Sequence, residues 1–287
     1  MTRMGSVQEL WRYPVKSMQG ERIDRVGLTD HGVPGDRGWA VRDEVRGGIR
    51  GAKKIAGLMQ LSARYTDEVG DDTVPPAEIS LPDGTTVSSG ADDAAARVSA
   101  AVGHEVTLWP LVPAAQLDHY RRGAPSHDDI EAELREIFGR EPDEPLPDLT
   151  LFPPELMEFE SPPGTYFDAF PLLLMTDASL ARLAELVPDS AVDVRRFRPN
   201  LIVSVDGGER GFVEQQWAGR RLQVGEAVLE VTVPCPRCVM TTLPVAELPK
   251  DPAVLRAIVA EAEQNLGVYA KVERRGDVAV GDSVDLL

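Results

Sequence analysis

The sequence predicts a β-rich chain of the α+β class, with two regions of regular structure on either side of an acidic connector. Short apolar runs separated by Gly, Pro and Asp turns fill the first and last thirds of the chain, as in barrels and sandwiches. The middle is instead rich in Asp, Glu and Pro. We therefore expect an N-terminal β domain at 1–112, an insertion or linker at 113–163, and a second domain at 164–287.

In the first region, alternating and apolar runs predict short strands joined by tight turns. The run at 7–13 alternates and ends at Pro14, and the turn 82–84 separates two later runs. Residues 92–102 differ, because their alanines and apolar spacing predict a short helix. The expected strands are 7–13, 38–42, 58–65, 77–81, 86–87 and 106–109.

The connector at 113–163 is unlike either flank. Apolar residues recur with helical spacing over 128–138, at Ile130, Leu134, Ile137 and Phe138. Residues 142–154 form a proline-rich acidic stretch, which predicts irregular backbone. Such a segment can be a lid over a site, but mobile acidic linkers are commoner.

The last region returns to regular structure. A buried strand at 172–175 precedes a helix that begins at Thr176 or Asp177 and whose apolar positions are Leu180, Leu183 and Leu186. A second helix is expected at 251–264, ending before Gly267. Further strands are expected at 201–205, 227–231, 268–272 and 283–286.

Net charge and cysteine content argue against several classes of protein. The 287 residues include 47 acidic and 30 basic side chains, a net charge of −17 that opposes binding to nucleic acid and anionic membrane. Two cysteines cannot build a disulfide framework, and residues 1–12 lack the apolar core of a secretion signal. No segment approaches the ~20 apolar residues of a membrane span. We expect a cytoplasmic protein with no nucleic-acid or membrane partner.

The two cysteines lie together in Pro234-Cys235-Pro236-Arg237-Cys238, and this is the strongest chemical signal in the chain. A structural zinc site needs four ligands, and the histidines lack the spacing to complete one. A redox dithiol would open a helix after a strand, whereas residues 239–242 look β-like, so redox exchange is not favoured. Two interpretations remain: buried cysteines acting as small apolar residues, or a thiolate ligand to a soft metal.

Basic residues near strand ends form a second signal. They occur as Lys16-Ser17 after the strand at 7–13, as Asp36-Arg37 after a turn, and as Arg195-Arg196-Phe197-Arg198-Pro199-Asn200 before the strand at 201–205. A guanidinium and an amide at a strand end suit a phosphate or a heteroaromatic ring. Each group alone is explained equally well by surface charge. Together with the cysteines, they describe one soft ligand and several fixed cations, which suits an anionic metal cofactor that bears a phosphate.

These motifs occur in the same order in MOSC-domain proteins, which the chain resembles. The motifs are Trp11-Arg12-Tyr13-Pro14-Val15-Lys16-Ser17, Gly35-Asp36-Arg37, Phe197-Arg198-Pro199-Asn200, Pro234-Cys235-Pro236-Arg237-Cys238 with Thr241-Thr242, Gly267-Val268-Tyr269 and Val280-Gly281-Asp282. The match is nearest to the two-part type, which includes the mitochondrial amidoxime-reducing components and their bacterial relatives. It covers most of the chain except about 113–163. The resemblance implies an N-terminal β-barrel-like domain followed by a MOSC β-barrel with peripheral helices.

The resemblance also implies a molybdenum cofactor, a molybdopterin with one terminal phosphate, and chemistry independent of pyridoxal phosphate. By its position in the motif, Cys238 matches the metal ligand at the catalytic centre. The chemistry agrees, because a thiolate binds a high-valent metal where a neutral thiol does not. Cys235 would then be structural. The positions that match cofactor-binding residues are Lys16, Ser17, Arg37, Arg198, Asn200, Arg237, Cys238 and Tyr269. One departure is Asp168-Ala169-Phe170, where relatives place small hydroxyl residues, and the acidic segment is another.

The activity implied is reduction of N-hydroxylated compounds such as amidoximes or hydroxylamines, with the metal cycling between Mo(VI) and Mo(IV). The chain has no ferredoxin-like C-terminal extension, so a separate redox protein would supply electrons to act on the small-molecule substrate. Asp168 is a candidate proton donor that can equally be a helix cap. The alternative function is a carrier of the cofactor or of sulfur without its own turnover, since MOSC domains also form part of cofactor sulfurases. A third hypothesis, a decayed site, conflicts with the intact set of cations and thiol.

Overall fold

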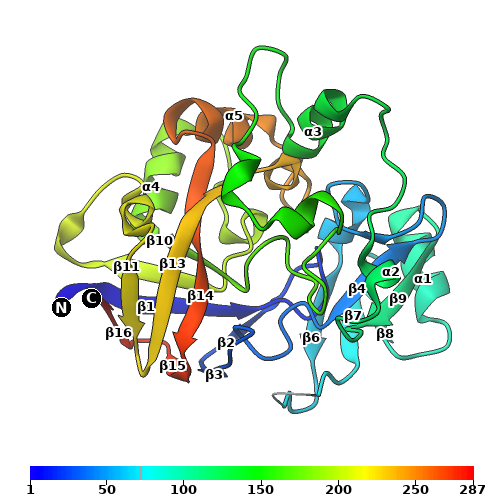
Figure 1. Cartoon of the computed structure of the whole chain (residues 1–287), viewed down its shortest axis with the longest axis horizontal. Helices are drawn as coiled ribbons and strands as arrows, with labels where there is room; N and C mark the ends of the chain where they lie inside the picture. Colours follow the sequence, from blue (N-terminus) through cyan, green and yellow to red (C-terminus); the bar gives the residue numbers. More distant parts are fainter. Residues whose placement is uncertain (71–72) are drawn as a thin grey trace.

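In a computed structural model, which describes residues 1–70 and 73–287, the chain is organised around one large sheet (Figure 1). Its strands follow the order β11-β10-β14-β13-β12-β16-β1-β2, and pairing of β1 with β11 closes the sheet into a barrel. Within it, β10 and β11 pair in parallel and the other neighbours are antiparallel. The strands are β1 Thr2–Arg12, β2 Glu21–Ile23, β10 Leu172–Thr176, β11 Leu201–Val205, β12 Arg221–Val224, β13 Ala227–Pro236, β14 Asn265–Arg274 and β16 Ser283–Leu286.

The barrel follows from the apolar pattern of its strands. Every residue of β10 is buried, as a continuous apolar run between two neighbouring strands requires. Val7 and Leu10 of β1 join Val203 of β11 and the fully buried Trp217 in one core. The first strand of the chain therefore completes a barrel whose other strands come from the last third, which confirms the β-rich α+β class.

The rest of the N-terminal region forms a second core beside the barrel. Its two small sheets pack around Leu58, Met59 and Ile79, and Met240 and Leu243 from the far end of the chain reach into the same core. The expected strand at 58–65 is partly wrong, because residues 56–60 form a 3₁₀ turn that buries Leu58 and Met59. The elements are β4 Trp39–Asp43, β5 Ile49–Arg50, η1 Ala56–Gln60, β6 Ser62–Tyr65, β7 Ala77–Ser80, β8 Thr86–Ser88, α1 Ala94–Val102 and β9 Val106–Pro110.

Helices α4 (Asp177–Leu186) and α5 (Pro252–Glu261) cover one side of the barrel and share an apolar cluster with it. The Thr176 side chain accepts a hydrogen bond from Ser179 N, which confirms it as the cap of α4. Among the described residues, no helix has both the length and the apolarity to cross a membrane. The remaining short elements are β3 Arg25–Leu28, which pairs with β15 Gly276–Ala279, and the turns η4 Val194–Arg196, η5 Asp206–Gly208, η6 Val213–Trp217 and η7 Val239–Thr242.

The segment 113–163 extends along both cores and is attached to each by charged side chains (Figure 1). On one side Lys54 pairs with Glu133 at 2.8 Å and Glu136 at 3.1 Å, and on the other Arg256 of α5 pairs with Glu144. Its elements are α2 Leu117–Tyr120, α3 Ile130–Phe138, η2 Leu149–Leu151 and η3 Pro154–Met157.

Candidate functional site

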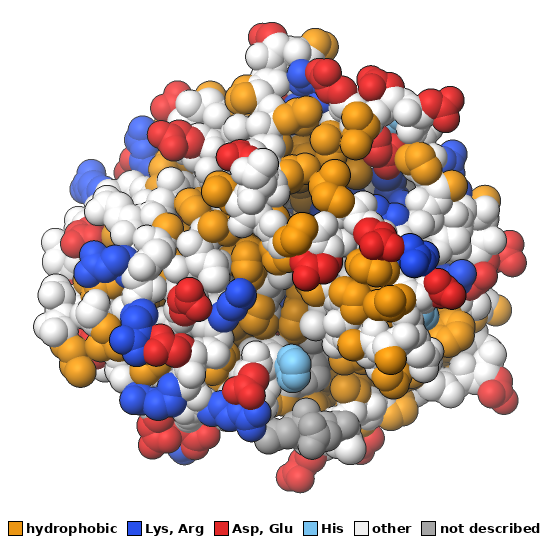
Figure 2. Space-filling view, viewed as in Figure 1, with side chains coloured by type: hydrophobic (Ala, Val, Ile, Leu, Met, Phe, Trp, Pro, Cys, Tyr) orange, Lys and Arg blue, Asp and Glu red, His pale blue; other side chains and the backbone are white. Residues whose placement is uncertain are grey.

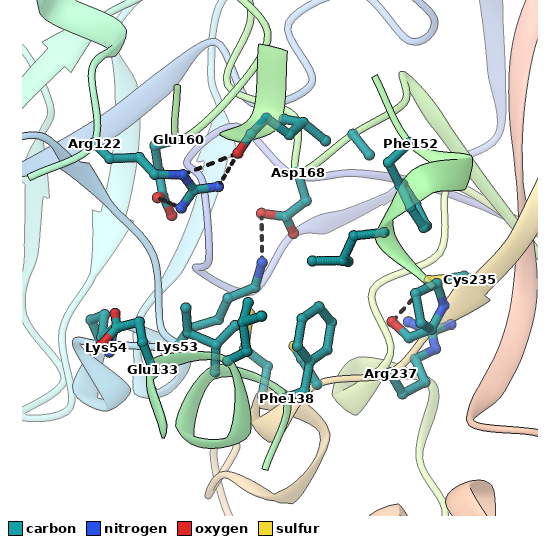
Figure 3. Close-up of a pocket in the computed structure, with 18 of the residues that line it drawn as sticks. Lys53, Lys54, Arg122, Glu133, Phe138, Phe152, Glu160, Asp168, Cys235 and Arg237 are labelled. Atoms are coloured by element: carbon teal, nitrogen blue, oxygen red, sulfur yellow. Dashed lines mark hydrogen bonds and ion pairs between the residues drawn. The ribbon is translucent and has the colours of Figure 1, made fainter. Parts of the chain in front are cut away.

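A cavity of about 490 Å³ lies where the barrel, the second core and the 113–163 segment meet (Figure 3). Its inner end is formed by loops that precede β10 and β11 and by the end of β13, and its outer end by α3, η2 and η3. Of the sequence-predicted site residues, the cavity brings together Arg37, Arg198, Asn200, Arg237, Cys238 and Tyr269, along with Cys235.

The two thiols occupy different positions in this cavity. Cys238 is partly exposed and stands directly before η7, whereas Cys235 is buried within β13. Burial raises the pKa of the Cys235 thiol, and the nearby Arg237 only partly opposes this. The β-like expectation for 239–242 is wrong, because Thr241 Oγ1 bonds back to the Cys238 carbonyl at 3.0 Å within a helical turn. Cys238 is thus the thiol that a ligand in the cavity can reach.

Arg237 holds the loop between the cysteines in place. Its guanidinium donates to the carbonyls of Leu266 at 2.7 Å and Phe197 at 3.0 Å, with Met175 Sδ 3.3 Å away. Gly267 permits this approach, since a Cβ there would lie 3.2 Å from Arg237 Nη2 and 2.7 Å from Leu174 O. Arg237 therefore brings a buried positive charge beside Cys238 and ties the end of β13 to the start of β14 and to the loop before β11.

Arg198 and Arg37 supply two further cations, and both lie over the ring of Tyr13, with Arg198 at 4.3 Å and Arg37 at 5.2 Å from the centroid. Arg37 pairs with the buried carboxylate of Asp36. In contrast, Nη1 of Arg198 is buried and has no hydrogen-bond partner among the residues that the structure describes. Burial and then the neighbouring Arg37 lower the pKa of Arg198 to about 10, so it stays charged at neutral pH. A buried, charged donor without a partner is costly unless an anion meets it.

The backbone is strained at three of these positions. Ser17, Arg37 and Arg198 have φ angles of 69°, 52° and 58°, in the left-handed region that non-glycine residues rarely adopt. Each such residue costs about 1 kcal/mol and clusters of them are typical of functional sites. Three of the six non-glycine residues with positive φ in the described part of the chain are therefore residues that the sequence motifs singled out.

Three predicted residues serve as supports. Lys16 and Ser17 are not among the described residues that line the cavity. Lys16 is buried behind Asp168, to which it donates at 2.9 Å, and Ser17 Oγ accepts from Ala52 N at 2.9 Å. Asn200 lines the cavity, but its amide donates to Asp36 at 3.0 Å and accepts from Leu173 N, so it fixes the mouth of β11.

Sequence reasoning missed Lys53 and underestimated Asp168, which face each other in the cavity (Figure 3). Asp168 Oδ1 lies 2.9 Å from Lys16 and 3.5 Å from Lys53. Burial would raise the pKa of Asp168, but Lys16 and Lys53 outweigh it and hold that pKa well below the usual range. Asp168 is therefore an anion and a poor proton donor. The adjacent lysines 53–54 after a short strand were the available signal.

The arginine run divides in the structure. Arg195 forms ion pairs with Asp193 and Glu247 on the surface, as expected if the run only supplies surface charge. Arg196 also lines the cavity, but its buried guanidinium donates to carbonyls, among them that of Leu243 at 3.0 Å. Asp36 and Arg37 do not form a surface pair, because the Asp36 carboxylate is fully buried.

Comparison with known families accounts for both halves of this architecture. Residues 163–285 match the MOSC domain and residues 4–109 match the MOSC N-terminal beta barrel domain. The two matches leave out most of the 113–163 segment. The chain belongs to the MOSC-domain proteins with an N-terminal MOSC β-barrel domain, which confirms the resemblance seen in its motifs.

Individual relatives are similar over nearly the whole chain. Mitochondrial amidoxime reducing component 2 of Bos taurus and of Homo sapiens are each 26% identical, over 99% of this chain and 84% of the relative. Among solved structures, the YUAD protein of Bacillus subtilis aligns with 100% of this chain and 96% of its own, at 14% identity and a TM-score of 0.44. YiiM of Escherichia coli aligns with 41% of this chain and 54% of its own, at 16% identity and a TM-score of 0.30.

Proposed function

We propose that the chain is a molybdenum-cofactor-dependent oxidoreductase that reduces N-hydroxylated compounds with electrons from a separate redox protein. Membership of the MOSC family supports a molybdenum-cofactor-binding domain, and similarity to amidoxime reducing components supports amidoxime-type substrates. One observation carries the proposal: the partly exposed Cys238 thiol lines the same cavity as Arg198, whose buried Nη1 has no partner within residues 1–70 and 73–287.

The inner end fits such a cofactor on the chemistry of its donors. A thiolate is a soft ligand for a metal, and Cys238 is the more exposed of the two cysteines that line the cavity. The Arg198 nitrogen needs an anionic acceptor, which a terminal phosphate provides. Arg37 lies beside Arg198 and adds a second guanidinium, which also pairs with Asp36. These residues would hold the group at both of its ends.

When bound, the cofactor would supply the two-electron reduction, and the chain's own residues would orient the reactants. Arg237 would fix the loop that presents Cys238, through its bonds to Leu266 O and Phe197 O. The Lys16–Asp168–Lys53 cluster would keep a charged, hydrogen-bonding surface at the side of the cavity. Because Asp168 stays ionised, we assign it an accepting role toward N–H and O–H groups and no role as proton donor.

The test is Cys238→Ala, purified from a host that makes the cofactor. We expect a folded protein whose molybdenum-dependent amidoxime reduction falls by more than about a hundredfold, because the metal loses its protein ligand. The measurements are turnover with a chemical reductant, metal content, and fluorescence of the released, oxidised pterin.

The matched control is Cys235→Ala, which removes the neighbouring thiol at a position that the proposal treats as structural. It should retain metal and most of its turnover. The same protein from a host unable to make the cofactor gives the background. Equal turnover in Cys238→Ala and the unmodified chain would overturn the proposal.

A carrier function for cofactor or sulfur is the second candidate, and the accessibility of Cys238 also favours it. Mass spectrometry of the intact protein separates the two. A persulfide on Cys238, without bound metal and without turnover, would favour the carrier.

Two further predictions remain part of the proposal. We propose three segments in the chain, at 1–112, 113–163 and 164–287. Strand β1 belongs to the first segment by sequence but lies in the barrel formed by the last. We also keep a cytoplasmic location as a proposal. Fractionation of the native host's cells would test it.

A further inference from the structure

The outer wall of the cavity contains a helix face that no core covers. Apolar side chains recur on one face of α3, at Ile130, Leu134, Ile137 and Phe138, and all four line the cavity. A face of this kind normally packs against a core. No residue of α3 is buried, however, and Ile130 is 63% exposed. The apolar face of α3 is therefore turned toward the cavity.

Residues of the next two turns extend this surface. Phe152, Leu156 and Met157 also line the cavity, and Met157 is 63% exposed. Figure 2 shows apolar side chains gathered around a hollow in the region of α3, η2 and η3. We call the cavity-lining apolar residues of α3 and of 152–157 the apolar wall. Exposed apolar surface of this extent in a cavity indicates a place for an apolar ligand.

The apolar wall is continuous with the thiol end of the cavity. The Phe152 ring contacts those of Phe170 and Tyr269 at centroid distances of 6.1 and 6.2 Å, and the latter two lie 5.3 Å apart. Tyr269 in turn lies beside Cys235, which lines the same cavity as Cys238, three positions further along the chain. Charged side chains such as Lys53 and Asp168 lie to one side of this path (Figure 3). A molecule on the apolar wall would therefore reach toward the thiol end.

We propose that the apolar wall binds the hydrocarbon body of the substrate, while its N-hydroxylated head points to the Cys238 end. This rests on the proposed function and narrows it. The substrate is an uncharged or weakly basic N-hydroxylated compound with an aromatic or long aliphatic group, and a small polar compound binds poorly. The occupant is a small molecule because the wall lines a concave cavity that also holds the cations and the thiol, and is not a flat face.

The first experiment measures equilibrium binding of straight-chain alkyl amidoximes, from acetamidoxime to octanamidoxime, by titration calorimetry. It uses the full chain, both loaded with cofactor and purified from a host that cannot make it. We expect affinity to rise by about threefold for each added methylene, because each is removed from water. An affinity that does not change along the series in either form overturns the inference.

The second experiment places the effect on the wall with variants that do not disturb a core. Met157→Ser and Ile130→Ser remove exposed wall residues, while Leu151→Ser, 56% exposed in the same segment, does not touch the cavity. We expect octanamidoxime to bind about fivefold more weakly to each wall variant, with acetamidoxime unaffected. Leu151→Ser should change neither. An equal loss in Leu151→Ser, or no loss in the wall variants, overturns the inference.

Failure of this inference can be told apart from failure of the proposed function. A chain that holds molybdenum and reduces amidoximes without regard to chain length keeps the function and loses the inference. A chain that binds long amidoximes through the wall but holds no metal loses the function and keeps the binding site. Sedimentation of the variants tests whether a second copy of the chain occupies the wall instead. A dimer that Met157→Ser abolishes, together with an affinity that does not change with alkyl length, would make the wall an interface between copies and overturn the inference.

Discussion

The inner and outer ends of the cavity differ in how their side chains are held. At the inner end, Arg237 is buried and bonded to backbone carbonyls, and Arg198 is buried on a strained backbone. At the outer end, α3 contains no buried residue and is attached through ion pairs such as that of Lys54 with Glu133. The inner end is fixed by hydrogen bonds to main-chain carbonyls and the outer end largely by ion pairs, while Arg140 joins the two by donating to Arg237 O at 3.0 Å.

The difference has a physical consequence for each end. Fixed donors lose little entropy when an anion binds, so the inner end suits a single ligand held in one orientation. An apolar wall contributes affinity in proportion to the area that it covers, with little directional preference. Substitutions at the inner end should therefore remove the cofactor, and those at the outer end should change ligand preference or local stability.

Among the substitutions that test this contrast, those at Arg198 have the largest expected effect. Arg198→Gln should reduce retention of the cofactor by about tenfold to a hundredfold, because it removes a charged donor that is already buried and unpaired. Pterin fluorescence per chain after extended dialysis measures this. Arg198→Gly should lose the cofactor equally, yet unfold at the same or higher denaturant concentration, since glycine relieves the strain at a φ of 58°.

The matched control is Arg195→Gln, three positions earlier, whose guanidinium pairs with Asp193 and Glu247 at the surface. It should keep its cofactor. Retention that falls to the same extent in both glutamine variants would mean that overall charge, and not the inner end, holds the group.

Much of the barrel could be predicted from the sequence, because its strands carry their own evidence. The apolar run at 172–175 and the cap at Thr176 are local signals, and both are confirmed. The run 239–242 misled, because β-branched residues there favour a strand in isolation. In the fold, Met240 enters the second core and Thr241 bonds back to its own turn, so packing overrides propensity.

The site could be predicted only in part. Motif spacing indicated Arg37, Arg198 and Cys238, which the structure brings to one cavity. It could not show that Lys16 faces Asp168 from behind, because that contact joins positions 152 residues apart. The apolar wall could not be predicted either. The periodicity of 128–138 indicates a helix with an apolar face, but it does not indicate what that face packs against.

The boundary between the two ends can be tested at Asp168. Its folded-state pKa is held low, so the carboxylate adds stability above its unfolded pKa of about 3.9, and that stability is lost as pH falls through the folded pKa. Asp168→Asn should destabilise the chain by about 1–2 kcal/mol at neutral pH. The substitution is destabilising because the buried Lys16 ammonium loses its carboxylate partner. Solvent screening at Asp168, whose side chain is 42% exposed, reduces this loss of stability.

Urea unfolding of both proteins at neutral pH and near pH 3 measures this difference, which should shrink at the lower pH. Asp128→Asn is the control, since Asp128 lines the cavity but makes no ion pair in the described structure. A deficit for Asp168→Asn that is the same at both pH values would show that the carboxylate does not stabilise the fold through its charge.

The smallest expected effect is at the outer end, in Lys54→Met. Lys54 bonds to Ser126 at 3.0 Å and pairs with Glu133 and Glu136, so its loss should destabilise the chain by at most about 1 kcal/mol. The main effect should be on local stability. Proteolysis within 113–163 should become faster, while pterin retention stays unchanged. Lys250→Met, at an exposed lysine with no ion pair among the described residues, should alter neither. Loss of the cofactor in Lys54→Met would mean that α3 and the inner end move as one unit, and the contrast between the two ends would not hold.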